Sequence, residues 1–289
     1  MHVLVTGGNA GIGYFAAEQL ASAGAEVTIG SRDAAKAEAA AASIRSHVSG
    51  AKIRHVRLDL ADLASLEPVV NAVGALDALV CNAGVMLDEP PRRETADGHE
   101  MMFGTNHLGH FALVARLLPN LAPDGRIVTT GSFAAKSSSL DFADLQSERD
   151  YHPKRAYERS KLAQMLFALE LDRRLRAAGS KRLSVVAHPG GALDSLTPSR
   201  PPVHVRTAGQ WLRGLPARAL LQGKDAGARP AVRAVLGPDV AGGQLWGPRT
   251  FGLRGRPRLE PRWANLTEDP SAARLWAESV TLTGLDPLG

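Results

Sequence analysis

The sequence has one cysteine, Cys81, among its 289 residues. A single thiol excludes an internal disulfide and a cysteine-rich metal site, and we expect Cys81 to be a small buried hydrophobic residue. No apolar run approaches the ~18–20 residues that span a bilayer, and no secretory signal is visible. These absences predict a cytoplasmic protein without an integral membrane span.

Acidic residues are scarce between positions 196 and 262, where twelve Arg or Lys face three acids, Asp225, Asp239 and Glu260. The whole chain has a formal net charge of +5 and a pI of about 9.6. Such an excess can indicate nucleic acid, lipid or a phosphorylated substrate. However, 27 of the 34 basic residues are Arg, as GC-rich coding produces, and no dense basic run is interleaved with aromatic residues. We therefore predict no nucleic-acid partner.

Short apolar runs alternate with longer helical stretches along most of the chain. We expect strands over residues 2–6, 26–31, 52–59, 76–84, 125–132 and 182–190. Helices are expected up to Gly24, over 33–47, 62–74 and 99–119, and around Tyr157. This alternation predicts an α/β fold: one Rossmann-type domain over 1–289, with a doubly wound parallel sheet and helices on both faces. Residues 191–223 break the rhythm and are predicted to be a substrate-covering insertion.

A glycine-rich stretch, "TGGNAGIG" at 6–13, lies between the first strand and the first helix. Glycines at 7, 11 and 13 permit a tight turn, a close approach of the backbone to a pyrophosphate, and close packing of helix on strand. The N-terminus of the following helix attracts the phosphate charge. We expect this stretch to bind a dinucleotide through Thr6, Gly7, Asn9, Gly11, Ile12 and Gly13.

The residues after the second strand indicate which dinucleotide is bound. An acid there would bond a ribose 2′-hydroxyl, whereas this chain has Ser31 and Arg32, and a guanidinium suits a 2′-phosphate. We therefore favour NADP(H) over NAD(H). The alternative is a surface Arg32 paired with Asp33. After the third strand, Asp59 and Leu60 are placed to contact the adenine, although Asp59 could equally cap a helix.

"RAYERSKLAQ" (155–164) places Tyr157 and Lys161 four residues apart in a helical stretch. Side chains at this spacing share one face of a helix. An ammonium beside a phenol stabilises the phenolate and lowers a pKa that starts near ~10. The pair predicts a proton donor that works near neutral pH.

Five motifs occur in the order typical of the short-chain dehydrogenases/reductases, a family that the sequence resembles over essentially its whole length. They are "TGGNAGIG", "CNAG" (81–84), the serine that ends the fifth strand, "AYERSK" and "HPG" (188–190). "NHLGHFAL" (106–113), the long gap from Ser132 to Tyr157 and the late "LWAESVTLTGL" look most like the branch of retinol dehydrogenases and WW-domain oxidoreductases.

The resemblance implies a role for each matching position. Tyr157 corresponds to the acid/base, Lys161 to the residue that lowers its pKa and binds the nicotinamide ribose, and Ser132 to the residue that polarises a carbonyl. Asn106 matches a residue that holds a water in the proton relay. The resemblance places five residues at the cofactor: Asn82, Ala83 and Gly84 along the cleft, and Pro189 and Gly190 beside the nicotinamide. Asp194, with Ser195 beside it, stands where the family usually has a threonine that contacts the carboxamide.

Several of these positions have a second interpretation. Ser137, Ser138 and Ser139 compete with Ser132 but lie beyond the strand end. Asn106 could instead hydrogen-bond the backbone of a neighbouring strand. His107 and His110 have the spacing of a metal pair, but no third ligand accompanies them, so we expect packing and no metal.

The leading interpretation is an NADP(H)-dependent oxidoreductase acting on a small-molecule carbonyl or alcohol. A non-catalytic NADP(H) sensor or scaffold, and a non-redox or epimerase activity on this fold, are alternatives. Apolar residues in 191–223 favour an apolar substrate. The arginines at 200, 206, 213 and 218 either meet an anionic handle or form a solvated face. The family commonly forms dimers or tetramers, and the resemblance extends this expectation to the chain.

Overall fold

Eight strands form one sheet in the computed structural model, which describes residues 1–267 and 269–289. The strand order is β3-β2-β1-β4-β5-β6-β7-β8, with β8 antiparallel to β7 and the other pairs parallel. The strands are β1 (His2–Thr6), β2 (Glu26–Ser31), β3 (Ile53–Arg57), β4 (Leu76–Cys81), β5 (Leu121–Thr130), β6 (Leu183–Ala187), β7 (Leu245–Thr250) and β8 (Arg254–Glu260). The predicted α/β fold with a doubly wound sheet is confirmed.

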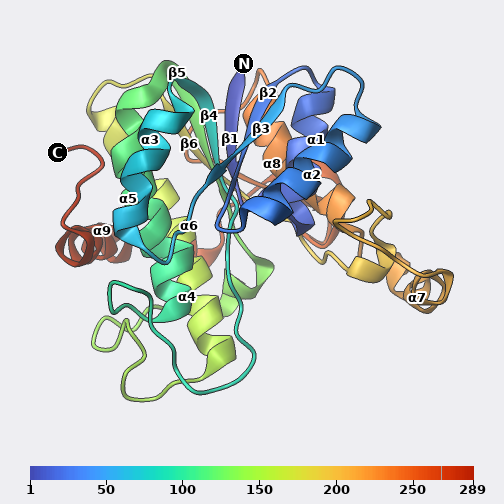
Figure 1. Cartoon of the computed structure of the whole chain (residues 1–289). Helices are drawn as coiled ribbons and strands as arrows, with labels where there is room; N and C mark the ends of the chain where they lie inside the picture. The colour runs from blue at the N-terminus through green and yellow to red at the C-terminus, as the bar shows by residue number, and fades with distance from the viewer. Residues whose placement is uncertain (268) are drawn as a thin grey trace.

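Helices cover both faces of this sheet (Figure 1). One face carries α1 (Gly11–Ser22), α2 (Ala34–His47) and α8 (Lys224–Leu236). The other carries α3 (Glu67–Val73), α5 (Gly109–Leu117), α6 (Pro153–Ala177) and α9 (Asp269–Thr283). A short α4 (Met101–Phe103) leads into α5, and α7 (Ala208–Gly214) projects away from the sheet at the lower right of Figure 1.

Side-chain alternation along the central strands builds the two cores. Val3 and Val5 of β1 are fully buried against α1, α2 and α8, whereas Leu4 between them is buried in the cluster under α3, α5 and α6. Successive side chains of a strand point to opposite faces, so a strand buried on both sides is apolar throughout. This explains why "HVLVT" shows a continuous apolar run.

The prediction missed the last two strands. β7 and β8 form a hairpin, and its strands contain Pro248 and Pro257, which donate no hydrogen bond to a ladder and weaken the strand signal. The hairpin places an antiparallel strand at the edge of an otherwise parallel sheet. The prediction of a wholly parallel sheet is therefore wrong at this edge.

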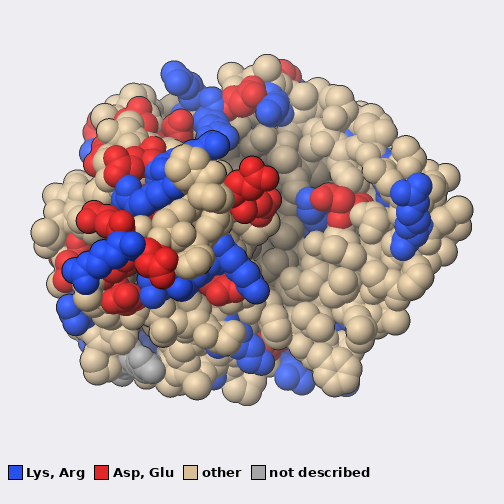
Figure 2. Space-filling view, turned by 90° about the horizontal axis from the view of Figure 1, so that it is seen from below, with Lys and Arg blue, Asp and Glu red and all other residues tan. Residues whose placement is uncertain are grey.

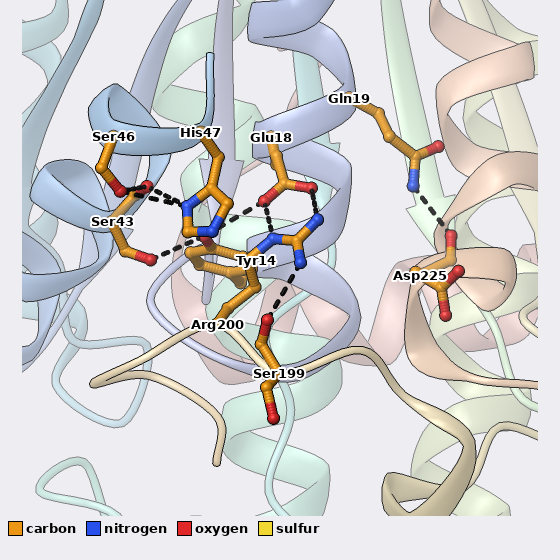
Figure 3. A network of polar contacts seen from close by, with 9 residues as sticks. All are labelled: Tyr14, Glu18, Gln19, Ser43, Ser46, His47, Ser199, Arg200 and Asp225. Atoms are coloured by element: carbon orange, nitrogen blue, oxygen red, sulfur yellow. Dashed lines mark hydrogen bonds and ion pairs between the residues drawn. The ribbon is translucent and has the colours of Figure 1, made fainter. Parts of the chain in front are cut away.

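Residues 191–223, called the flap below, lie beside α1. Arg200 makes a two-point ion pair with Glu18 of α1, at 2.6 and 3.1 Å, and Tyr14 donates to the same carboxylate at 3.2 Å (Figure 3). Val203 packs against the core on this side. The flap is thus held by an ion pair and by apolar packing against the face of the sheet that carries α1, α2 and α8.

The carboxyl ends of the parallel strands open onto a hollow. β1 and β4 are neighbours in the sheet but lead to helices on opposite faces, so a crevice forms beyond their ends. Figure 2 looks onto this edge and shows the hollow between two flanks, with charged side chains dense on the left flank and sparse on the right. The predicted site residues fall around this hollow.

Candidate active site

One cavity of about 570 Å³ gathers most of the predicted site residues. Those that line it are Gly7, Asn9, Gly11, Ile12, Ser31, Arg32, Asp59, Leu60, Asn82, Ala83, Gly84, Ser132, Tyr157, Lys161 and Pro189. They come from the ends of six strands, β1 to β6, and from α1 and α6. Residues far apart in the sequence therefore form one continuous wall.

The glycine-rich turn has the form that the spacing predicts. Gly7 has φ of +66°, and a Cβ on it would lie 2.9 Å from the Cα of Ala83. A Cβ on Gly13 would lie 2.3 Å from the carbonyl oxygen of Gly7. Both positions therefore exclude any larger residue, and Gly13 serves helix packing behind the wall of the cavity.

The N-terminus of α1 is open toward an anion. In the described part of the chain, no side chain caps α1 and no acid lies in its first turn. The first N–H groups of a helix have no partner within it and carry partial positive charge. Because Gly11 and Ile12 line the cavity, this end of α1 fits a phosphate group.

Two cations lie where the second strand ends. Arg32 and Lys36 both line the cavity. Asp33 accepts from the backbone N–H of Lys36 at 3.0 Å and pairs with its ammonium at 3.6 Å, so Asp33 caps α2. Within the described residues, Arg32 makes no ion pair within 4.0 Å, and the alternative of an Arg32–Asp33 pair is wrong.

For Asp59 the sequence predicts two roles, contact with the adenine and capping of a helix. Its side chain lines the cavity, and its Oδ1 accepts from the backbone N–H of Ala61 at 3.0 Å. The helical turn that follows is preceded by Asp62, so Asp59 closes a turn rather than capping a helix.

Tyr157 and Lys161 both face the cavity, but they are not coupled as the spacing predicts. Burial raises the pKa of Tyr157, and the neighbouring Ser132 hydroxyl acts in the opposite direction. Lys161 donates to the carbonyl of Thr130 at 2.7 Å and to Gln164 at 2.6 Å. The expectation that Lys161 lowers the pKa of the phenol is therefore wrong for this arrangement, because the ammonium points at other acceptors.

Burial also lowers the pKa of Lys161 itself to about 8. Its partner Gln164 lies 3.2 Å from the Nδ1 of His110, whose Nε2 lies 2.9 Å from the Thr6 hydroxyl. That hydroxyl accepts from the backbone N–H groups of Asn82 and Ala83, each at 2.9 Å. Thr6 thus lies behind the cavity wall and positions it, and a buried polar chain joins Lys161 to the glycine-rich turn.

Asn106 lies in a π-helical turn, Gly104–Leu108, between α4 and α5. Its side chain accepts from the N–H of Val85 at 2.7 Å and donates to the Val85 carbonyl and to Ser160, at 3.0 and 2.9 Å. Ser160 donates to the backbone carbonyl of Tyr157 at 2.8 Å. The backbone-bonding alternative therefore describes its side chain, which fixes the strand exit against the helix that carries Tyr157.

Two predicted cofactor residues lie away from the cavity wall. Gly190, with φ of +67°, packs under the β7–β8 turn, where a Cβ would lie 2.5 Å from the Leu253 carbonyl. Asp194 pairs instead with the ammonium of Lys224, at 2.6 Å, and lies 3.7 Å from His204. Among the residues that line the cavity none belongs to the flap, which reaches the wall through the Asp194–Lys224 pair, and its covering of a substrate stays a prediction.

Sequence reasoning missed several lining residues. Lys224, the first residue of α8, adds a further cation to the wall, near the glycine-rich turn, because a Cβ on Gly11 would lie 3.9 Å from its Cδ. No spacing in the sequence points to Lys224, whereas Lys36 could have been found as a cation in the first turn after Arg32. Val85 and Met86 add apolar side chains to the wall, and Thr105 lines it as well.

His107 and His110 serve packing, as expected. His107 lies 2.8 Å from Ser279 of α9 and is surrounded by Phe103, Phe111 and Phe167. Burial lowers the pKa of His107 to about 3 and that of His110 to about 4. Cys81 is fully buried beneath α5 and α6, as predicted.

Comparison with known proteins agrees with this site. A model of the short chain dehydrogenase family matches residues 1–144. Mouse polyprenol dehydrogenase is 38% identical over 97% of this chain and 83% of its own, and human retinol dehydrogenase 13 is 36% identical over 98% and 85%. A crystal structure of an uncharacterised protein from Mycobacterium paratuberculosis is 37% identical, with a TM-score of 0.80 over 99% of this chain and 94% of that one.

An open helix N-terminus beside a glycine-rich turn, with serine, tyrosine and lysine in the same cavity, defines a dinucleotide-dependent oxidoreductase. The chain belongs to the short-chain dehydrogenase/reductase family, in its retinol dehydrogenase branch. It is an oxidoreductase of the carbonyl/alcohol class. No described helix has the length and apolar character to cross a bilayer.

Proposed function

We propose that the protein transfers a hydride between NADP(H) and an apolar alcohol or the corresponding carbonyl compound. The observation that supports this most is that Ser132, Tyr157 and Lys161 line the same cavity as the open end of α1. Acid/base groups and a phosphate cradle in one cavity serve a reaction in which the cofactor is a reactant.

The cationic wall favours NADP(H). Arg32 has no carboxylate partner in the described part of the chain, and Lys36 lies one turn further along the same wall. Both would hold a 2′-phosphate, Arg32 through its planar guanidinium. Lys224 and the N-terminus of α1 would hold the diphosphate.

Two side chains can stabilise the negative charge that develops on the substrate oxygen during reduction. The nicotinamide, when bound, supplies or accepts the hydride. Ser132 donates a hydrogen bond to the substrate oxygen, and Tyr157 donates the proton during reduction. The raised pKa of Tyr157 keeps the phenol protonated at neutral pH, so its hydroxyl can donate the proton during reduction.

The names of the relatives suggest the substrate class. Retinol and polyprenol are both isoprenoid alcohols, and the apolar side chains of Val85 and Met86 line the same cavity as Ser132, Tyr157 and Lys161. We propose that the substrate of this protein is likewise an isoprenoid-like alcohol or aldehyde. A cytoplasmic location and a dimeric or tetrameric state remain predictions, and size-exclusion chromatography with light scattering tests the latter.

A direct test follows NADPH oxidation in the nicotinamide absorbance band with isoprenoid aldehydes and with polar aldehydes of similar length. We expect turnover of the isoprenoid aldehydes and a loss of about 10²–10⁴ in rate for Tyr157→Phe, with NADPH binding unchanged. Tyr151→Phe is the matched control, since it removes a phenol outside the cavity. Turnover that survives Tyr157→Phe would contradict the proposed role.

A further inference from the structure

A second cavity lies between the flap, the start of α8 and the edge strand β8. Its volume is about 440 Å³. Gly223 and Asp225 line it, while Lys224 between them lines the cofactor cavity, so the two cavities lie on opposite sides of the first turn of α8. They share no lining residue. Occupation of one therefore does not require displacement of a ligand from the other.

Four arginines line this second cavity: Arg206 and Arg218 from the flap, Arg229 from α8 and Arg254 from β8. Asp225 is the single acid in the lining. Cations drawn from three separate segments leave the cavity with a net charge of about +3 at neutral pH. Guanidinium groups stay positively charged at every pH at which proteins are normally folded.

These four arginines lack acidic partners among the residues that the structure describes. Within the described side chains, none of the four lies within 4.0 Å of a carboxylate. By contrast, Arg233, one turn after Arg229 on α8, pairs with Asp239, and Arg200 of the flap pairs with Glu18. Like charges that converge without counter-charges repel each other, and a bound anion relieves that repulsion.

The guanidinium groups of Arg206 and Arg254 are oriented by the backbone. Arg206 donates one bond to the Ser195 carbonyl at 3.3 Å, and Arg254 donates one to the Ala219 carbonyl at 2.9 Å. A guanidinium has five N–H donors, so most donors of both groups remain available. Oriented donors of this kind match the oxygens of a phosphate group.

The remaining wall is apolar and aromatic. Trp211 is 38% exposed, and Leu196, Pro198 and Leu221 complete the surface. A ring beside cationic groups provides a stacking surface next to an anion site. The lining therefore fits a molecule that has a phosphate at one end and a less polar part at the other.

We propose that this cavity is a second binding site, separate from the cofactor site, for a phosphorylated small molecule with at least two negative charges. Of the flap arginines, Arg206 and Arg218 serve this site, whereas Arg200 fastens the flap to α1. The proposal does not depend on the reaction proposed above.

The test titrates inorganic pyrophosphate, coenzyme A and pantetheine into the full-length protein by calorimetry, with and without saturating NADPH. We expect pyrophosphate and coenzyme A to bind in the presence of NADPH, and pantetheine, which lacks the phosphates, not to bind. Arg218→Ala/Arg229→Ala removes two exposed cations and should weaken both ligands about tenfold or more, because bonds to charged groups are strong. Trp211, the exposed tryptophan of the cavity, should report binding by a fluorescence change.

Arg256→Ala is the matched control, because Arg256 is exposed on the same edge strand and lines neither cavity. It should leave both affinities unchanged. The proposal is overturned if neither phosphorylated probe binds, if NADPH displaces them, or if the control weakens them as much as the double variant does. Failure of NADPH to bind would count against the proposed function alone, because the arginine variants are also compared in the titrations without NADPH.

Discussion

The Asp194–Lys224 ion pair predicts two substitutions with opposite effects on cofactor binding. Lys224 lines the cofactor cavity near Gly11, while Asp194 belongs to the flap and holds the Lys224 ammonium at 2.6 Å. If Lys224 binds the diphosphate of NADP(H), Asp194 competes with the cofactor for the same cation. Lys224→Ala should then weaken NADPH binding, and Asp194→Asn should strengthen it.

The exposure of the two side chains sets the size of each effect. Asp194 is 64% exposed and Lys224 27% exposed, so their pair is worth about 1 kcal/mol or less. Asp194→Asn should therefore lower the NADPH dissociation constant by at most about fivefold. Loss of a charge-assisted bond from Lys224 to a diphosphate should raise it about tenfold.

A double-mutant cycle provides the decisive assay. The dissociation constant of NADPH is measured by calorimetry for the unmodified protein, for Asp194→Asn, for Lys224→Ala and for the combination. Because Asp194 acts through Lys224, the double variant should bind like Lys224→Ala alone. Weaker binding by Asp194→Asn would refute this reasoning and would support the direct contact with the nicotinamide that the sequence predicted.

Three further predictions follow from individual contacts. Arg32→Ala should raise the KM for NADPH about tenfold or more and leave that for NADH nearly unchanged, and an equal loss with both cofactors would exclude a 2′-phosphate site. Arg200→Ala removes the ion-pair partner of Glu18, whose side chain is 11% exposed. Urea titration should therefore show a loss of about 1–2 kcal/mol in the free energy of unfolding. An unchanged urea midpoint would contradict the role of this ion pair in holding the flap. The folded-state pKa values of His107 and His110 lie below the ordinary 6.5, so the unfolded chain takes up protons first as the pH falls. Stability should fall between pH 6.5 and about 4, by up to about 1.4 kcal/mol per pH unit for each imidazole, and a urea midpoint that stays constant over this range would disprove their neutral burial.

Local stereochemistry made much of the site predictable. The left-handed backbone of Gly7 and the close contacts of Gly13 are requirements that no larger residue meets, so the glycine spacing reveals the turn. The spacing of Tyr157 and Lys161 places both on one face of a helix, and the structure has them in one cavity.

Contacts between residues far apart in the chain could not be predicted from the sequence. The direction of the Lys161 ammonium depends on the Thr130 carbonyl, which belongs to another strand. The partner of Asp194 comes from a helix that begins thirty residues later, and the ion pair between the flap and α1 joins residues 182 positions apart. The β7–β8 hairpin escaped detection because prolines interrupt both of its strands.

The edge strand β8 also limits how copies of the protein can meet. It carries Pro257, which cannot donate a backbone bond, and the exposed Arg256 and Arg258. An intruding strand would find a missing donor and a row of positive charges, both of which oppose edge-to-edge pairing. Self-association that extends the sheet across β8 is therefore disfavoured, whereas β3 at the opposite edge carries no proline.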